Sequence, residues 1–303
     1  MPTNTTLVIN WHLTEACNYS CRYCYAKWDE HASSRDLIRD PEKTKAFLSA
    51  LYHFFQPGNC VNQLWHQMRW EAVRLNFAGG EPLLYHRRLP DVMRDARALG
   101  FDVSIITNAS RLTGNVIQTL GPDLSWLGIS VDSASSTTNR AIGRLDRHGN
   151  MLNIDALADA LANARVAYPR LQLKLNTVVN KANEAEDFAP LITRLAPDKW
   201  KLLRALPIVT DALTVSDQEF TAFVARHRQL ASIMCAEDNS EMRDSYLMID
   251  PYGRFFQNGQ QSARGGYKYS RPILEIGVAQ AFDEIDFDPS KFSARYPQQI
   301  VAE

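Results

Sequence analysis

Short apolar runs alternate with longer segments of helical periodicity through the first two thirds of the chain. Strands and helices that alternate in this way form right-handed βαβ units around a parallel sheet. Six units are fewer than the eight of a closed barrel, so the pattern predicts an α/β fold with an open, partial (βα)6 barrel. The predicted strands are residues 7–13, 73–77, 102–107, 126–131, 171–179 and 200–206, and the predicted helices are residues 42–55, 89–99, 113–120, 154–166 and 188–195.

The pattern changes after residue 209, where we predict that a barrel domain (1–209) gives way to a C-terminal extension (210–303) that closes over the substrate. A helix is expected over 216–233, because Ser216 and Glu219 have the spacing of a capping box. A hairpin should follow over 246–256, around the turn that Pro251 and Gly253 favour. Residues 257–270 are polar and rich in glycine, which is typical of a mobile loop.

Composition narrows the class of protein. The chain of 303 residues has 45% hydrophobic and 22% charged residues, which is typical of a globular domain. Its net charge of -1 argues against a general nucleic-acid partner. The polar N-terminus resembles no secretion signal, and no window approaches the roughly 20 apolar residues of a membrane span. We therefore expect a cytoplasmic protein with reduced thiols and no membrane partner.

Three of the five cysteines lie within eight residues, directly after the first predicted strand. Thiolates spaced as in Cys17, Cys21 and Cys24 can surround one small object, and they select zinc, copper(I) or an iron-sulfur cluster. A zinc site would need a fourth ligand, for which His12 and His31 are near enough. A cluster held by three cysteines would instead leave one iron open to a small molecule.

A second motif, Gly79-Gly80-Glu81-Pro82, directly follows the second predicted strand. In parallel sheets ligands bind beyond the carboxyl ends of the strands, so this motif and the cysteines are expected at the same end. Glycines at positions 79 and 80 let the backbone turn sharply and approach a ligand closely.

The order of these motifs resembles that of the radical S-adenosylmethionine (SAM) superfamily. The matching features are the Cys-x3-Cys-x2-Cys-aromatic run and the glycine motif after the next strand. The resemblance implies a radical SAM barrel in which three cysteines hold a 4Fe-4S cluster and SAM chelates the fourth iron. It assigns Cys17, Cys21 and Cys24 to the cluster, and Tyr25, Gly79, Gly80, Glu81, Asn108, Ser130 and Arg144 to SAM.

A closer resemblance, to viperin and the prokaryotic viperin-like proteins, covers nearly the whole chain. The matching stretches include residues 75–82, 107–110, 129–133, 142–144, 174–176, 199–201 and 242–247. The family resemblance implies an enzyme of antiviral defence that acts on a nucleoside triphosphate, with CTP first and UTP or GTP as alternatives. The product would be the 3′-deoxy-3′,4′-didehydro nucleotide, formed by 4′-hydrogen abstraction and loss of the 3′-hydroxyl. The electron donor would be a flavodoxin or a ferredoxin.

Strand alternation independently supports a triphosphate site, because several cations should share the inner face of the barrel. Cations that point inward are costly to bury without anionic partners. Tyr246, in the last matching stretch, is expected to contact the substrate or to donate hydrogen to a radical, and the alternative is a tyrosine packed in the core. The residues expected to bind the substrate are Arg74, Asn76, Lys174, Asn176, Lys199, Lys201, Tyr246 and Arg264.

Two positions depart from the animal viperins, which carry serine where this chain has Ala78 and lysine where it has Arg74. A hydroxyl contact to phosphate is lost and a planar guanidinium is gained, which affects affinity and nucleotide choice. The chain also lacks the N-terminal amphipathic helix of the animal proteins.

Two alternatives remain at the level of the sequence. A radical SAM enzyme that modifies a peptide or a cofactor would share the cysteines but would not need the inward cations. A zinc-stabilised binding module would use the cysteines for structure alone.

Overall fold

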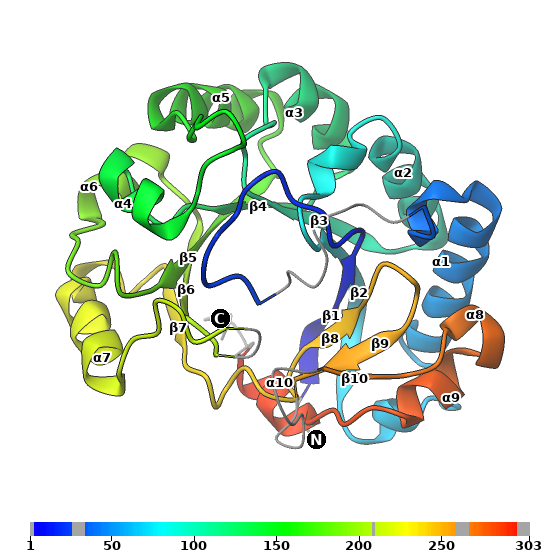
Figure 1. Ribbon diagram of the computed structural model, residues 1–303. Coiled ribbons are helices and arrows are strands. Elements are labelled where there is room, and N and C mark those ends of the chain that lie inside the picture. The colour runs from blue at the N-terminus through cyan, green and yellow to red at the C-terminus, as the bar shows by residue number, and fades with distance from the viewer. Residues whose placement is uncertain (1–2, 26–33, 208–209, 259–266, 296–303) are drawn as a thin grey trace, which may run out of the picture.

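The computed structural model describes residues 3–25, 34–207, 210–258 and 267–295. Its strands form one curved sheet around a central space, with the longer helices on the outside (Figure 1). The order of strands is β10-β9-β8-β1-β2-β3-β4-β5-β6-β7. The strands are β1 Thr3–His12, β2 Arg69–Ala78, β3 Asp102–Thr107, β4 Trp126–Ser130, β5 Gln172–Val179, β6 Lys199–Arg204, β7 Met234–Glu237, β8 Leu247–Ile249, β9 Phe255–Gln257 and β10 Lys268–Tyr269.

The six predicted strands are present as β1 to β6, and each pairs in parallel with the next, as expected of βαβ units. Two further parallel strands extend this sheet. On one side β7 pairs with β6, and on the other side β8 pairs with β1. The sheet therefore includes strands from both sides of residue 209, and the predicted domain boundary there stays a prediction.

The helices follow the predicted pattern closely in the first two thirds of the chain. Side chains of Asp40, Thr113, Asn153 and Ser216 cap the helices that follow them, which explains where those helices begin. The α-helices are α1 Pro41–Phe55, α2 Leu89–Leu99, α3 Gly114–Leu120, α4 Ser136–Ile142, α5 Ile154–Ala167, α6 Ala189–Leu195, α7 Asp217–Arg226, α8 Ile273–Ile276, α9 Val278–Asp283 and α10 Pro289–Arg295, and the 3-10 turns are η1 Leu37–Arg39, η2 Gln63–His66, η3 Pro82–Tyr85, η4 Gly121–Asp123 and η5 Arg228–Leu230.

The C-terminal part contains one wrong expectation and one confirmed one. The predicted helix 216–233 ends at Arg226, and a 3-10 turn then leads into β7. The hairpin is confirmed as β8 and β9, which pair antiparallel around the turn at Asp250. The polar segment 257–270 contributes β10, which pairs with β9.

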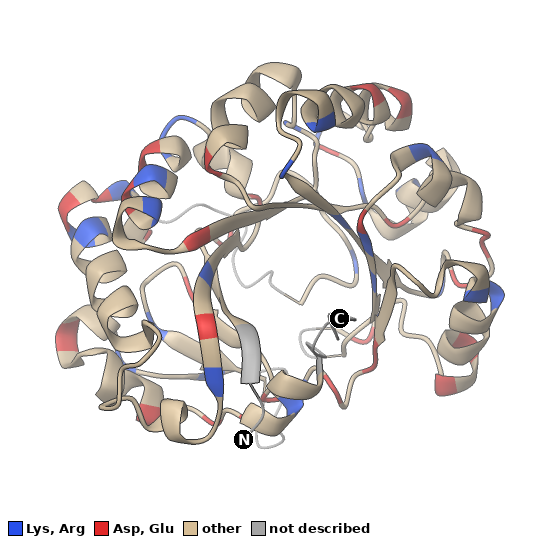
Figure 2. Cartoon of the chain, turned by 180° about the vertical axis from the view of Figure 1, so that it is seen from behind, with Lys and Arg blue, Asp and Glu red and all other residues tan. Residues whose placement is uncertain are grey.

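The two faces of the sheet differ in polarity. On β5 the buried side chains of Leu173 and Leu175 alternate with Lys174 and Asn176. Since apolar residues pack against the surrounding helices, the polar residues line the central space. Figure 2 shows basic positions on the strands around this space as well as on the outer helices.

No helix within the described residues combines the length and the hydrophobicity that a bilayer crossing requires.

Candidate functional site

The turn after β2 packs directly on the cysteine loop, which we define as residues 13–25. The backbone amides of Gly80 and Glu81 donate to the carbonyls of Thr14 (2.7 Å) and Ala16 (2.9 Å). A Cβ atom on Gly80 would lie 1.9 Å from the carbonyl oxygen of Ala16, and Gly79 has a φ of +116°. The glycines are therefore required for close approach to the chain itself. Their predicted contacts with SAM stay a prediction.

Gly80→Ala is expected to displace the cysteine loop, because the new methyl group would clash with the Ala16 carbonyl. Both groups are attached directly to the backbone, so no side-chain rotation can relieve the clash. Overpacking of this kind typically destabilises a protein by about 1–3 kcal/mol. Thermal unfolding and the iron content after reconstitution would measure the effect. An Ala variant at Gly114, where a Cβ atom meets nothing within 4 Å, is the matched control. Unchanged iron content and stability in Gly80→Ala would contradict the packing argument.

Glu81 links the carboxyl ends of β2 and β3. Its side chain is fully buried and accepts hydrogen bonds from the Leu83 amide (2.9 Å), the Thr107 hydroxyl (2.6 Å) and the Asn108 amide (2.8 Å). Burial raises the pKa of this carboxyl group, and the three hydrogen bonds partly oppose that rise. Glu81 thus connects the segment after β2 to the end of β3 through hydrogen bonds. Its predicted contact with the SAM ammonium stays a prediction.

Asn108 lies against the first cysteine. Its side-chain amide donates to Cys17 Sγ (3.6 Å) and to Asn18 Oδ1 (3.0 Å), and the backbone amide of Tyr19 also donates to Cys17 Sγ (3.4 Å). Hydrogen bonds to cysteine sulfur are among the factors that set the potential of an iron-sulfur cluster. The predicted SAM residue Asn108 is therefore placed beside a predicted cluster ligand.

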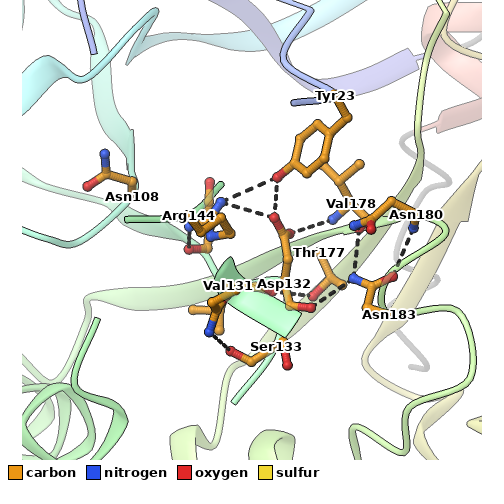
Figure 3. Close-up of polar contacts among 12 residues, drawn as sticks. Tyr23, Asn108, Val131, Asp132, Ser133, Arg144, Thr177, Val178, Asn180 and Asn183 are labelled. Atoms are coloured by element: carbon orange, nitrogen blue, oxygen red, sulfur yellow. Dashed lines mark hydrogen bonds and ion pairs between the residues drawn. The ribbon is translucent and has the colours of Figure 1, made fainter. Parts of the chain in front are cut away.

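A buried polar network around Asp132 anchors the other end of the cysteine loop (Figure 3). Asp132 follows β4 and is fully buried; it accepts the Tyr23 hydroxyl, pairs with Arg144 (3.0 Å) and accepts the Val178 amide (2.8 Å). Arg144 also donates to the carbonyl of Ser130. Tyr23 stands between the second and third cysteines, so the network fixes the loop relative to β4 and β5.

The sequence reasoning gave no role to Tyr23 or Asp132. A signal was available for Asp132, because it directly follows a predicted strand at the end where ligands bind. Arg144 and Ser130, which were assigned to the SAM carboxylate, lie within this network, and that assignment stays a prediction.

Tyr23→Phe should weaken the anchor without changing its shape. Loss of one hydrogen bond to a buried carboxylate typically costs about 1–3 kcal/mol. We expect a lower unfolding temperature and a shifted electron paramagnetic resonance signal of the reduced cluster, because the loop that carries Cys21 and Cys24 is less well fixed. Tyr168→Phe, which removes an exposed hydroxyl bonded to Gln118, serves as the control. Identical spectra for Tyr23→Phe and wild type would argue against the anchor.

The donor set of the cysteine loop fits a 4Fe-4S cluster. Burial raises the pKa of the Cys17 thiol to about 11 and that of Cys21 to about 12, and neighbouring cysteines contribute to both shifts. Within the described residues no three Cys, His, Asp or Glu side chains are grouped to hold a single metal ion. Each cysteine of a 4Fe-4S cluster binds a different iron, so its sulfurs need not converge on one point. Binding must displace protons from these thiols.

The predicted zinc alternative finds no support in the position of His12. Its ring is 1% exposed and lies edge-on to Phe256, with 5.0 Å between ring centroids. Burial lowers the pKa of His12 to about 4. His31 lies outside the described residues.

The predicted cations meet in the central space. Burial lowers the pKa of Lys174 well below its usual value, and the charges of Lys201, Arg74 and Lys199 lower it further. Arg74 is on β2 and Lys174 is on β5, so their side chains approach each other only across the concave face of the sheet. Gly128 on β4 leaves room for the Lys174 side chain, whose Cε would lie 3.4 Å from an added Cβ. The arrangement is a cation cluster suited to several phosphates.

One carboxylate, which the sequence reasoning missed, faces this cluster. Glu237, at the end of β7, is 3% exposed and pairs with Lys201 at 2.7 Å. The Tyr246 hydroxyl lies 2.7 Å from the Lys201 ammonium and also donates to Glu237. Glu237 was missed because residues 234–237, which form β7, were assigned to no element. The structure thus brings Tyr246 into the same site as the cations.

Asn76 and Asn176 lie two positions after Arg74 and Lys174 on β2 and β5, and so on the same face. Asn76 and Asn176 are 3% and 6% exposed. Asn76 bonds to Asn10 and to Ser104 (both 2.8 Å), whereas the Asn176 side-chain oxygen is buried and accepts no hydrogen bond within the described part of the chain. An unsatisfied buried amide oxygen of this kind is suited to a ligand. The Tyr25 carbonyl accepts from the Tyr267 hydroxyl (2.9 Å). Arg264 lies outside the described residues.

Residues 11–195 match the family model of the radical SAM superfamily. The chain is 41% identical over 293 residues to a protein of Psychrobacter lutiphocae named S-adenosylmethionine-dependent nucleotide dehydratase, covering 97% of this chain and 95% of that one. It is 32% identical over 305 residues to S-adenosylmethionine-dependent nucleotide dehydratase RSAD2 of Oncorhynchus mykiss, covering 95% of this chain and 78% of that one.

Solved structures with low sequence identity share the fold. Native anSMEcpe with bound AdoMet and Kp18Cys peptide superposes with a TM-score of 0.67 at 13% identity, covering 95% of this chain and 84% of that chain. Streptococcus suis SuiB bound to S-adenosylmethionine gives a TM-score of 0.57 at 12% identity, covering 96% of this chain and 68% of that chain.

Proposed function

Because the chain belongs to the radical SAM superfamily and, within it, to the S-adenosylmethionine-dependent nucleotide dehydratases, we propose that it dehydrates a nucleoside triphosphate in antiviral defence. CTP is the first candidate, and UTP and GTP are the alternatives. The product would be the 3′-deoxy-3′,4′-didehydro nucleotide. The observation that supports the choice of a triphosphate is the cation cluster around Lys174, because four neighbouring positive charges favour a ligand with several negative charges.

The cysteine loop would hold a 4Fe-4S cluster through Cys17, Cys21 and Cys24, and SAM would lie near Tyr25, Gly79, Gly80, Glu81, Asn108, Ser130 and Arg144. When bound, these groups supply a low-potential electron and an adenosyl radical that takes one hydrogen atom from the substrate. The protein around them would orient both groups and exclude water, since Tyr23, Asp132 and Arg144 are all buried.

The four cations would hold the triphosphate. Lys174 and Asn176 are two positions apart on β5, with Asn176 nearer to the carboxyl end of the strand. A triphosphate at Lys174 would therefore direct the ribose toward Asn176 and the cysteine loop. The 4′ hydrogen leaves as an atom, the 3′ hydroxyl leaves as water after it takes up a proton, and one further electron completes the double bond. The Tyr246 hydroxyl would supply a hydrogen atom, that is, this electron and proton together, and the external electron donor and a solvent proton would then restore the resulting tyrosyl radical to tyrosine.

Glu237→Gln tests the carboxylate in the site. Removing its charge should tighten nucleotide binding by about tenfold, or 1.4 kcal/mol, because the phosphates no longer compete with it for Lys201. Product formed per 5′-deoxyadenosine should fall, since the Tyr246 hydroxyl exchanges a charged carboxylate acceptor for a neutral amide oxygen. Calorimetry and chromatography would measure the two quantities, and Glu71→Gln, on the exposed side of β2, is the control. Weaker binding in Glu237→Gln would refute the competition.

The function itself is tested by anaerobic incubation of the reconstituted protein with SAM, dithionite and CTP, UTP or GTP in turn. We expect one nucleotide to accelerate 5′-deoxyadenosine formation and to be converted to a product lighter by one water. SAM cleavage that no nucleotide accelerates would reject the proposal. The reaction in the cell also needs an electron donor, for which we propose a flavodoxin or a ferredoxin.

A further inference from the structure

A cavity borders the first part of the cysteine loop. It has a volume of about 1100 Å³ and is lined by Cys17, Tyr19, Arg111, Arg147 and His148, among others. None of the four cations of the central space is among the lining residues. The cavity and the cation cluster thus have different lining residues, and one predicted cluster ligand, Cys17, is in the wall of the cavity.

Two exposed arginines line this cavity, and two more lie within three residues of its lining residues in the sequence. Arg111 and Arg147 line it, and Arg22 reaches the carbonyl of Ala141 (3.4 Å), next to Arg140 at the end of α4. We name this group, Arg22, Arg111, Arg140 and Arg147, the arginine face. All four are exposed, and no carboxylate in the described ranges forms an ion pair with them.

Several other exposed arginines each have a carboxylate beside them. Arg94, Arg165, Arg194 and Arg271 each form an ion pair with an aspartate or a glutamate. Asp146 is the carboxylate among the lining residues, and its oxygens accept hydrogen bonds from residues 148 and 150 of its own loop. Since the whole chain has a net charge of -1, the positive charge here is local.

A local positive surface favours an acidic protein partner, because charge complementarity steers association and fixes orientation. The proposed reaction needs electrons from outside the protein, and low-potential electron carriers are typically small acidic proteins. An electron must enter where the cluster ligands come closest to the surface. Cys17 is in the wall of the cavity, so a carrier seated there would lie beside one cluster ligand.

We propose that an acidic one-electron carrier protein docks on the arginine face and passes electrons to the cluster past Cys17. The proposal rests on the function proposed above, because it presumes a cluster in the cysteine loop. In each docking event the carrier is oxidised by one electron and the cluster is reduced by one electron, so the step is balanced without another reactant.

The test uses the reconstituted holoenzyme and an acidic bacterial flavodoxin that is kept reduced by its reductase and NADPH. The variant is Arg111→Glu/Arg147→Glu. The control is Arg170→Glu/Arg228→Glu, because these arginines are exposed and precede β5 and β7, at the opposite ends of the strands. Cluster reduction is followed by loss of absorbance near 400 nm in a stopped-flow instrument, and binding of the oxidised flavodoxin is measured by calorimetry.

We expect the variant to be reduced by flavodoxin at least about tenfold more slowly than wild type and control, in line with rate gains of about 10–1000-fold from electrostatic steering. The difference should shrink as ionic strength rises. Arg111→Lys/Arg147→Lys should restore most of the rate. Dithionite, which needs no docking surface, should reduce all these proteins equally and support equal turnover.

Equal flavodoxin-driven rates for variant and wild type would overturn the docking proposal, and so would a wild-type cluster that dithionite reduces but flavodoxin does not. A wild-type protein that converts no nucleotide even with dithionite would instead overturn the proposed function. The single variants Arg111→Glu and Arg147→Glu provide the same comparison should the double variant unfold at a lower temperature.

Discussion

Replacement of Cys21 by alanine is expected to abolish cluster assembly and nucleotide conversion together. Two thiolates cannot replace three, because one iron would then lose its only protein ligand. The loss of iron and of turnover should exceed the roughly 10–100-fold effect of changing a residue outside the ligand set. Iron and sulfide content, absorbance near 400 nm and 5′-deoxyadenosine formation would measure the loss.

Cys60→Ala is the matched control for this variant, because Cys60 is exposed and its thiol donates to the carbonyl of Gly58. It should assemble a complete cluster and retain turnover. A Cys21→Ala protein with full iron content and unchanged absorbance would remove Cys21 from the proposed ligand set. The far-ultraviolet circular dichroism of both variants should match that of wild type.

Lys174→Met is expected to have the second largest effect, on nucleotide binding alone. Methionine keeps much of the side-chain volume but lacks the charge that would meet the phosphates. Truncating one partner of a buried charge pair costs about 2–5 kcal/mol, which is about 30-fold to several thousand-fold in affinity. Calorimetry should show this loss, with SAM binding unchanged. Lys43→Met, at an exposed ion pair with Asp40, is the control.

The same lysine makes binding depend on pH. Burial and three neighbouring cations lower the pKa of Lys174 in the free protein, so its charged form is disfavoured. A bound triphosphate favours the charged form and raises that pKa. Binding should therefore take up a proton when the pH lies between the two values, and the observed heat should vary with the ionisation enthalpy of the buffer. Equal nucleotide affinity in Lys174→Met and in wild type would refute the role of Lys174.

Much of the fold could be predicted because local sequence and tertiary environment agree in the βα repeats. In β5 the alternation of Leu173 and Leu175 with Lys174 and Asn176 indicated both the strand and its inward face. The spacing of Ser216 and Glu219 correctly predicted the start of α7, since a capping box is a local interaction.

The errors and omissions have a common cause, which is that they depend on contacts distant in sequence. Met234–Glu237 forms a strand because β6 offers it a free edge, and that edge cannot be read from four residues. Glu237 was missed for the same reason. The Gly79-Gly80 pair was found, but its need for glycine comes largely from the backbone of Thr14 and Ala16, more than 60 positions earlier in the chain. Likewise, no local pattern joins Tyr23 to Asp132.

The parallel pairing of β8 with β1 has a consequence for how the chain is made. β1 precedes the other described strands of the sheet in the chain, yet one of its edges is completed only by Leu247–Ile249. Until those residues emerge, that edge presents unpaired backbone groups of a kind that promote aggregation. Closing a loop of this length is also a slow, entropically costly step. We therefore expect aggregation during synthesis and folding to limit the yield of forms truncated before Leu247, because these forms leave the edge of β1 unpaired.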